Sequence, residues 1–184
     1  MPKPPSMLRP FFIRPRTPIF SQILQWPFSD QFVTRLLRDD IPQRLAFGLG
    51  HGKMWGYQDA SRQVVGFGTR DYSRYTDGRP HPYIPLLAVN PQCLGKGHGT
   101  FIVEHLVGEA MQAICQSNST FHDTLFLDVY TDNATAIGLY KKCGFQWLGD
   151  DFDAIEQKNY SIMGRRVSVD GREALPATSP GKCS

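Results

Sequence analysis

The sequence predicts a mixed α/β fold of the α+β kind, and three observations carry that prediction. Residues 53–72 hold two strand-like runs around a turn, which is the pattern of a β-hairpin. The chain then alternates apolar strand-like runs with amphipathic helical runs. Two further strand-like runs follow, and we expect them to pair in antiparallel fashion. A meander of strands followed by strand–helix–strand–helix–strand is typical of a mixed sheet flanked by helices.

The composition is that of one globular domain. The 184 residues are enough to bury a core, and 41% of them are hydrophobic while 20% are charged. The net charge of +3 is small and the basic residues are scattered, so we expect no nucleic-acid partner. The four cysteines lack CxxC spacing, which argues against a metal site and predicts reduced thiols in a cytoplasmic protein.

The two ends of the chain differ from the rest. The proline-broken start lacks the apolar core of a signal peptide, and no run is long enough to span a membrane, so we expect no membrane partner. Residues 1–8 and 169–184 are rich in Pro, Gly, Ser and Lys and show no periodicity. We therefore expect a flexible N-terminus, a single domain at 9–168 and a flexible C-terminal tail.

The first half of the domain is expected to hold strands at both ends and helices between them. FFIRP predicts a strand, and PIFSQIL reads as its continuation. SDQFVTRLLRDD begins with a Ser cap and repeats apolar residues at helical spacing, and IPQRLAFGLG predicts a second short helix. KMWGYQD and RQVVGFGTRDY predict hairpin strands around DASR, followed by a turn-rich loop at YTDGRPH.

The next strand, HPYIPLLAVN, contains two prolines that a regular central strand would not tolerate. Pro85 marks either a β-bulge or a locally unpaired stretch. After the segment QCLGKGHGT, apolar residues from Ile102 to Ile114 form the stripe of a long amphipathic helix, with Glu104 and Glu109 on its solvated face.

The last elements complete the pattern. TLFLDVY predicts a buried strand, and DNATAIGLYKKCG predicts a helix capped by Asp132 and closed by Gly144. FQWLGDDF and NYSIMGRRV predict the final antiparallel pair.

The glycine-rich turn between a predicted strand and a predicted helix indicates an anion site. Free N–H groups converge at a helix N-terminus, and the helix dipole adds about half a positive charge there. A P-loop is excluded because Lys96 lies between glycines and Thr100 does not follow a lysine. A dinucleotide-binding turn needs GxGxxG in the first strand–helix unit, whereas this GxGxG lies in mid-chain. Tight packing of the backbone stays open as an alternative.

Two motifs, in the right order and at the right separation, resemble the GNAT N-acetyltransferase superfamily over about residues 53–166. LLAVNPQCLGKGHGTFIVEHL resembles its Arg/Gln-x-x-Gly-x-Gly/Ala motif, with Gly97 and Gly99 at the small positions and Leu94 at the Arg/Gln position. DVYTDNATAIGLYKKCGF resembles the Asn-x-x-Ala, Tyr and Gly-Phe series that follows. The resemblance implies a mostly antiparallel sheet splayed between its fourth and fifth strands. It also implies acetyl transfer from acetyl-coenzyme A to a small-molecule or peptide amine, and it makes a homodimer an expectation.

The resemblance further implies which residues hold acetyl-coenzyme A. The pyrophosphate would bind the N–H groups of the glycine turn, which consists of Leu94, Gly95, Lys96, Gly97, His98, Gly99 and Thr100. The pantetheine arm would pair with the main chain of Leu87, Ala88 and Val89. The second motif would contact the same arm through Asn133, Ala136 and Tyr140.

Acetyl transfer also needs an oxyanion donor, an acid and a base. The resemblance implies a bulge amide, for which Leu87 is the best candidate, and the Tyr140 hydroxyl as the acid. His81 has a suitable ordinary pKa for the base, and Asp128 is a weaker candidate. The residues expected to flank the acceptor cleft are Tyr72, Arg74, Tyr83 and Asp128.

Other interpretations stay open at this point. A catalytically silent module that binds or senses acyl-coenzyme A would keep the glycine turn without an acid or a base. A dinucleotide enzyme would bind NAD and ignore coenzyme A. Tyr140 is alternatively an aromatic core residue, and His81 a solvated histidine at the end of a loop.

Overall fold

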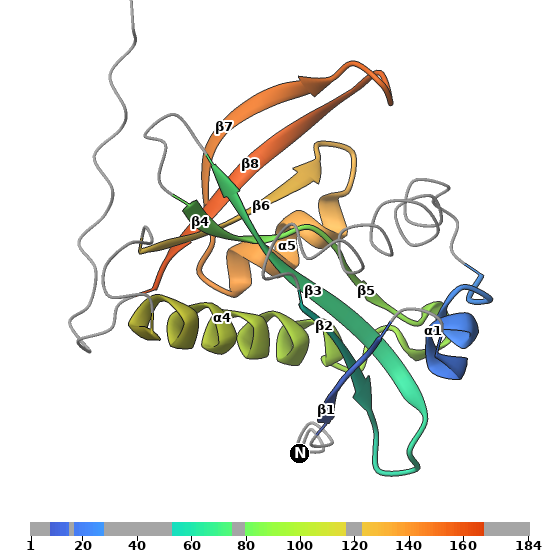
Figure 1. The fold of residues 1–184 in the computed structure, drawn as a ribbon. Helices are drawn as coiled ribbons and strands as arrows, with labels where there is room; N and C mark the ends of the chain where they lie inside the picture. The colour runs from blue at the N-terminus through green and yellow to red at the C-terminus, as the bar shows by residue number, and fades with distance from the viewer. Residues whose placement is uncertain (1–7, 15–16, 28–52, 75–79, 117–122, 168–184) are drawn as a thin grey trace, which may run out of the picture.

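The computed structural model describes residues 8–14, 17–27, 53–74, 80–116 and 123–167 (Figure 1). The two helices predicted between residues 29 and 50, most of the loop YTDGRPH, and the predicted flexible ends apart from Leu8 lie outside the described residues. The strands are β1 (Arg9–Phe12), β2 (Lys53–Gln58), β3 (Val64–Arg74), β4 (Pro80–Ile84), β5 (Leu87–Val89), β6 (Thr124–Tyr130), β7 (Gln146–Asp153) and β8 (Lys158–Arg166). The helices are α1 (Pro18–Ile23), α4 (His98–Gln116) and α5 (Ala134–Lys142), with a short 3-10 helix at Pro91–Cys93.

These strands form one mixed sheet, which confirms the predicted fold class. The strand order is β1-β2-β3-β4-β6-β8-β7, and β5 pairs with β3 outside that path. Among the described strands, β4 and β6 make the parallel pair, joined at Tyr83–Phe126 and Ile84–Leu127. Beyond this point β5 follows β3 while β6 follows β8, so the two halves of the sheet diverge as Figure 1 shows. This is the expected splay.

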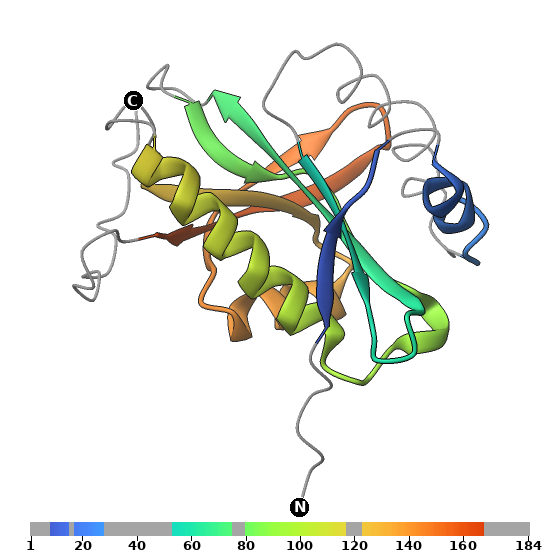
Figure 2. The same ribbon diagram turned by 60° about the horizontal axis from the view of Figure 1, so that its bottom comes forward.

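Helices α4 and α5 lie on the same side of the sheet (Figures 1 and 2). Two glycines on β3 bring α4 close: a Cβ on Gly66 would lie 2.4 Å from Ile102 Cδ1, and one on Gly68 would lie 2.7 Å from Leu106 Cδ1. The Tyr57 hydroxyl on β2 shares a 3.0 Å hydrogen bond with Nδ1 of His105 on α4. The two glycines on β3 therefore let α4 pack close to the sheet, and α4 begins within the glycine-rich segment.

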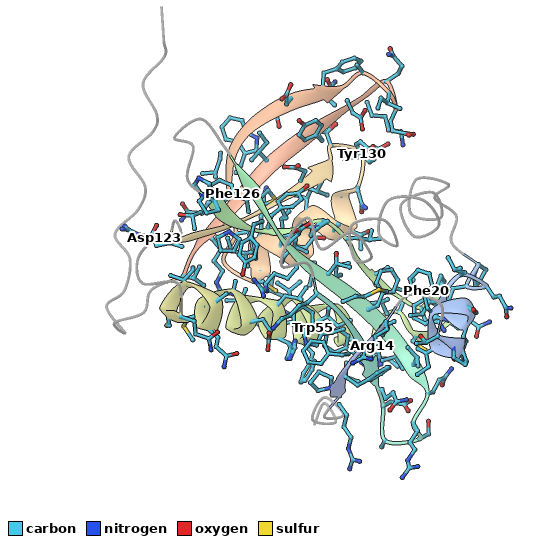
Figure 3. All side chains as sticks on the ribbon, in the orientation of Figure 1. Arg14, Phe20, Trp55, Asp123, Phe126 and Tyr130 are labelled. Carbon is cyan, nitrogen blue, oxygen red and sulfur yellow. The ribbon has the colours of Figure 1, made fainter. Side chains whose placement is uncertain are left out.

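The other face of the sheet carries a separate apolar cluster, and here one prediction is wrong. PIFSQIL does not continue the first strand, because Pro18–Ile23 form helix α1. Thr17 caps this helix by accepting a hydrogen bond from the Phe20 N–H at 3.3 Å, and Pro18 occupies the first turn, where its missing N–H has no cost. Phe20, labelled in Figure 3, and Ile23 are buried in this cluster. The Thr-Pro pair was the overlooked signal of a helix start.

The predicted hairpin and the final antiparallel pair are confirmed as β2–β3 and β7–β8. In the hairpin turn the Asp59 carboxylate accepts from the N–H groups of Ser61 and Gln63 at 2.9 and 3.0 Å. No helix within the described residues is long and apolar enough to cross a membrane.

Candidate active site

The strand HPYIPLLAVN is broken by a bulge, as one of the two interpretations of Pro85 predicted. Asp71 pairs with Tyr83 and Gly68 pairs with Leu87, so Thr69 and Arg70 lie opposite the longer stretch Ile84–Leu86. Thr69 closes this irregularity through its main chain and its hydroxyl: Oγ1 accepts from the Leu86 N–H and donates to the Leu86 carbonyl, each at 3.0 Å. The bulge separates β4 from β5.

The bulge leaves part of the β5 main chain facing the splayed side of the sheet. The Thr69 N–H donates to the Leu86 carbonyl and the Asn90 N–H donates to the Val65 carbonyl, each at 2.8 Å. Hydrogen-bonded pairs alternate along an antiparallel ladder, so the N–H groups of Leu87 and Val89 point away from β3. They point toward the side on which β6 has diverged. This edge can therefore pair with an extended ligand.

The glycine turn lies directly after this edge. Asn90 caps the short 3-10 helix, with its side-chain oxygen accepting from the Gln92 N–H at 3.0 Å. Gly95 and Gly97 take φ values of +77° and +79°, in the left-handed region that favours glycine. Among the described residues, a Cβ on either would meet no atom within 4 Å. The turn is thus free of side-chain bulk in front of the N-terminus of α4, where anions are stabilised.

Gly99 differs from the two glycines before it. A Cβ there would lie 3.0 Å from Leu139 Cδ2 on α5, and its φ is not in the left-handed region. Gly99 therefore serves the packing of α4 against α5, which was the alternative reading of the glycines and holds at this one position. Thr100 follows it in the first turn of α4 and is partly buried.

Three side chains of the turn have different environments. Leu94 is 63% exposed, and Lys96 is also exposed. His98 is buried, and this burial lowers the pKa of its imidazole, as does the nearby Lys96, whereas Asp59 in the hairpin turn acts in the opposite direction. His98 is therefore held in its neutral form, and Lys96 supplies the positive charge of the turn.

Helix α5 is capped by Asn133 and not by Asp132, which corrects the predicted cap. The Asn133 side-chain oxygen accepts from the Ala136 N–H at 3.0 Å. Asp132 instead forms an ion pair with Lys158 of β8 at 3.5 Å. The cap uses the oxygen of Asn133, so its side-chain NH₂ still faces outward as a donor in an exposed position.

Tyr140 lies near the end of α5 and is 8% exposed. Its ring packs against Phe145 with the centroids 5.9 Å apart. Burial, and to a lesser degree Cys143, raises the pKa of the phenol to about 12, so it stays protonated at physiological pH. Within the described part of the chain the hydroxyl makes no hydrogen bond. Tyr140 is both a core aromatic and an available donor.

The candidate acceptor residues of β4 and β6 share the face opposite α4 and α5. Leu125, Leu127 and Val129 are buried in the main core, so the alternate residues Phe126 and Asp128 face the other way. The Tyr83 hydroxyl donates to Asp128 Oδ2 at 2.7 Å, and the His81 ring, 3% exposed, meets Phe126 edge-on at 4.8 Å. The structure thus brings Tyr83 and Asp128 into contact and places His81 on the same face, against Phe126.

Tyr72 does not join this group. On β3 it alternates with Asp71, the cross-strand partner of Tyr83, so its side chain lies on the face of α4. There the Tyr72 hydroxyl accepts a hydrogen bond from Arg70, and the Arg70 guanidinium lies 4.9 Å from the Tyr72 ring centroid. Arg74 lies on β3 in register with Pro80, and its side chain is outside the described residues.

Two further carboxylates, which the sequence did not single out, lie on the same face as Asp128. Tyr160 donates to Asp151 at 3.1 Å, and Tyr130, labelled in Figure 3, donates to Asp153 at 3.0 Å. Burial, and then the negative charge of Asp151, raise the pKa of Asp128, whereas the hydrogen bond from Tyr83 lowers it. Asp151 is thus close enough to interact electrostatically with Asp128. The alternation in DDFD was the available signal, because residues two apart on a strand share a face.

Residues 17–145 match the model of the acetyltransferase (GNAT) family, which is more than half of the chain. No curated protein matches the chain. Within the described residues, no group of His, Cys, Asp and Glu side chains could hold a metal ion.

Several solved structures share the fold. The NatC complex bound to Gag peptide and CoA is similar at 17% identity and a TM-score of 0.63, covering 88% of this chain and 99% of that one. An IAA acetyltransferase from Bacillus cereus ATCC 14579 is similar at 18% identity and a TM-score of 0.61, covering 87% and 99%. A spermidine N-acetyltransferase SpeG chimera from Vibrio cholerae and hSSAT is similar at 14% identity and a TM-score of 0.65, covering 88% and 96%.

Proposed function

The chain belongs to the acetyltransferase (GNAT) family, which uses acetyl-coenzyme A, and we propose that it acetylates a cationic primary amine by direct attack in a ternary complex. The observation that carries the proposal is the continuity of two features: the free main-chain edge of β5 and the glycine turn without side-chain bulk at the start of α4. An edge that can pair with an extended arm, followed by an anion site, suits acetyl-coenzyme A.

The residues present fit this cosubstrate. The open space at Gly95 and Gly97 and the N–H groups of Leu94 to Thr100 would hold its pyrophosphate, with charge from Lys96. The main chain of Leu87, Ala88 and Val89 would hold its pantetheine arm, and Asn133, Ala136 and Tyr140 on α5 would face it. Acetyl-coenzyme A supplies an activated acetyl group as a thioester.

Leu87 and Tyr140 would stabilise the two sites where negative charge grows. The Leu87 N–H points away from β3 and would donate to the thioester oxygen, a fixed donor of the kind that enzymes place at such oxygens. The Tyr140 phenol would donate a hydrogen bond, and then its proton, to the departing sulfur. The apolar surroundings that raise the phenol pKa would also raise that of the thiol, which keeps the transfer feasible.

The proton of the amine would leave through a side chain on the face of the sheet opposite α4 and α5. An alkyl amine of pKa about 10.4 is mostly protonated at pH 7, so freeing it costs roughly 4–5 kcal/mol. His81 and Asp128 lie at different points on the same face of β4 and β6, and either one would accept this proton directly or through water. Tyr83 holds the Asp128 carboxylate in place with its 2.7 Å hydrogen bond.

The negative charge of the sheet face opposite α4 and α5, here called the acceptor face, favours a cationic acceptor. Asp128, Asp151 and Asp153 each receive a tyrosine hydroxyl, which orients the carboxylates without neutralising them. The proximity of Asp151 raises the pKa of Asp128 and shows that these groups share one field. A positively charged amine relieves this repulsion, and an amine with a second positive group can meet two carboxylates.

Release of free thiol from acetyl-coenzyme A with a panel of amines tests this proposal. We expect the rate to rise from a monoamine to a diamine and a triamine, and to be lowest with glutamate, whose carboxylates meet the same face. The rate with polycations should fall as salt is added. Binding of acetyl-coenzyme A without thiol release for any amine would instead show a silent binding module. A melting temperature raised by NAD and not by acetyl-coenzyme A would refute the cosubstrate.

A further inference from the structure

The side chain of Arg165 joins three elements of the fold. It comes from β8, and its Nη1 donates to Glu104 Oε1 on α4 at 2.8 Å and to the main-chain oxygen of Cys143 at 2.7 Å. Cys143 is the C-cap residue of α5. One guanidinium nitrogen therefore ties the end of α5 to α4. Glu104 is exposed, as expected for the solvated face of α4, and it also pairs with Arg165.

The turn that Arg165 holds also fixes Tyr140. The Gly144 N–H donates to the Lys141 carbonyl and the Phe145 N–H donates to the Tyr140 carbonyl, each at 3.0 Å, which is the Schellman pattern of a helix end. Gly144 takes a φ of +78°, as this motif requires. The apolar contact of the motif is the packing of the Tyr140 ring on Phe145. Both the main chain and the ring of Tyr140 thus depend on this turn.

Arg165 completes the turn in two ways. The last carbonyls of a helix have no donor within the helix, and Arg165 supplies one to the carbonyl of Cys143. A cation at a helix C-terminus also complements the helix dipole. The stem of Arg165 runs past Gly144, with Cδ and Nε each 3.7 Å from where a Cβ would be. The side chain is 27% exposed, so solvent only partly screens these contacts.

The contact between Arg165 and Glu104 fixes the position of the end of α5 relative to the glycine turn. Glu104 lies on α4, whose first residue, His98, belongs to that turn. Arg165 therefore links the helix that would begin at the pyrophosphate with the helix that carries the acid. A shift of about 1 Å between reacting groups can cost on the order of a hundredfold in rate. A link between these two helices thus bears on the geometry of the transfer step.

We propose that Arg165 is a positioning residue for acetyl transfer, holding the last turn of α5 so that the Tyr140 hydroxyl meets the reacting sulfur. The inference rests on the proposed function, because Arg165 has this role only through Tyr140. It differs from a purely structural role in one measurable way. Removing the guanidinium should matter for turnover only while Tyr140 has a hydroxyl to place.

A double-mutant cycle on the full chain tests this. The variants are Arg165→Met, Tyr140→Phe and both together, with the amine of the panel that gives the highest turnover. Arg166→Met is the matched control, because Arg166 is adjacent on β8, faces the other side of the sheet from Arg165, and its Nε donates to Asp123 at 2.6 Å. The readouts are kcat, the KM for acetyl-coenzyme A, and the melting temperature, with kcat expressed per folded molecule.

We expect Arg165→Met to lower kcat about five- to twentyfold and to leave the KM for acetyl-coenzyme A within about twofold. In the Tyr140→Phe background the same change should alter kcat by less than about twofold. Arg165→Lys keeps the charge and should recover much of the lost kcat, and Arg166→Met should leave kcat near that of the parent.

Equal losses of kcat from Arg165→Met in both backgrounds would overturn the inference and leave the proposed function intact. A lowered melting temperature with unchanged kcat would do the same, since Arg165 would then serve stability alone. If Arg165→Met does not fold, the cycle with Arg165→Gln, which also removes the guanidinium, is judged by the same two criteria. If Tyr140→Phe alone leaves kcat unchanged, the proposed acid is wrong and this inference falls with it.

Discussion

Thr69 and Leu86 share three hydrogen bonds across the bulge that divides β4 from β5. The Thr69 N–H donates to the Leu86 carbonyl at 2.8 Å, the Thr69 hydroxyl donates to the same oxygen at 3.0 Å, and the Leu86 N–H donates to that hydroxyl at 3.0 Å. Both residues are buried. The next residue is Leu87, whose N–H faces the splayed side of the sheet, so the orientation of the proposed oxyanion donor depends on Thr69.

Replacing Thr69 by Val keeps the shape of the side chain and removes the hydroxyl. The buried Leu86 N–H then loses its acceptor, which should lower the free energy of unfolding by about 1–3 kcal/mol. Because the bulge relaxes, we also expect kcat to fall about ten- to hundredfold in the thiol-release assay.

Thr69→Ser is the matched control, because it keeps the hydroxyl and should stay close to the parent in both measurements. A Thr69→Val protein that loses stability but keeps its kcat would contradict the proposed role of the Leu87 amide.

Substitutions at two glycines of the turn should have different effects, one on acetyl-coenzyme A binding and the other on stability. An Ala at Gly97 must adopt a φ of +79°, at a cost of about 1–2 kcal/mol, and its methyl group would enter the space where we propose that the pyrophosphate binds. We expect Gly97→Ala to weaken acetyl-coenzyme A binding at least about tenfold in calorimetry. Gly99→Ala should instead lower the melting temperature, because its Cβ would press on Leu139.

Gly108→Ala in the middle of α4 provides the reference, since a Cβ there meets no described atom within 4 Å and Ala is favoured in a helix. Unchanged binding in Gly97→Ala would show that the turn does not hold the anion.

Much of the fold was accessible to sequence reasoning because its signals are local. The hairpin, the glycine turn and the stripe of α4 each lie within a short segment, and the bulge was one of the two interpretations that Pro85 allowed. The first helix was missed because PIFSQIL is apolar enough for a strand, and the cap at Thr17 and Pro18 received too little weight.

Other features depend on distant partners. Asp132 and Asn133 are both good cap residues; Asn133 caps the helix, and Asp132 pairs instead with Lys158, a partner from β8 that the segment itself does not reveal. The contact of Arg165 with Glu104 joins residues far apart in the chain, as do the tyrosine–aspartate pairs on the acceptor face. Side-chain pairing across a sheet follows from register, which no single segment encodes.

His81 should affect the pH profile if it accepts the proton of the amine. His81→Ala removes a buried imidazole next to Phe126, and we expect the rate to fall most at low to neutral pH. The measurement is kcat/KM for the amine from about pH 6 to 9. A profile with the shape of the parent's would assign the proton to Asp128 or to water.

Tyr140→Phe keeps the ring and its packing on Phe145 but removes the proton donor. We expect kcat to fall by about 10²- to 10⁴-fold, the usual contribution of a general acid, with little change in acetyl-coenzyme A affinity. The pKa of about 12 places ionisation of the phenol well above physiological pH, so the parent should show no loss of rate from this group below about pH 10. If the melting temperature falls strongly while kcat per folded molecule is unchanged, Tyr140 is a core residue and not the general acid.

Asp128→Asn should raise the melting temperature and lower the turnover of cationic amines. The pKa of Asp128 is raised in the fold by desolvation and then by Asp151, although the side chain stays exposed, so the folded state carries a small penalty at every pH at which the carboxylate is ionised. Asn removes that penalty and keeps an oxygen for the Tyr83 hydroxyl. We therefore expect a higher melting temperature than the parent at pH 7, with the difference disappearing as the pH falls through the carboxyl range. Turnover of cationic amines should fall over the same neutral range, because the acceptor loses its carboxylate.

Asp150→Asn is the control of opposite sign. Hydrogen bonds from Ser161 and Trp147 lower the pKa of Asp150, so its carboxylate contributes stability that is present at neutral pH and lost as the pH falls through its folded pKa. Asp150 alternates with Asp151 on β7 and faces away from the acceptor side, so its replacement should lower the melting temperature at pH 7 and spare turnover. If Asp128→Asn and Asp150→Asn shift the melting temperature in the same direction, Asp128 does not carry an unrelieved charge. The case for a cationic acceptor would then lose its electrostatic basis.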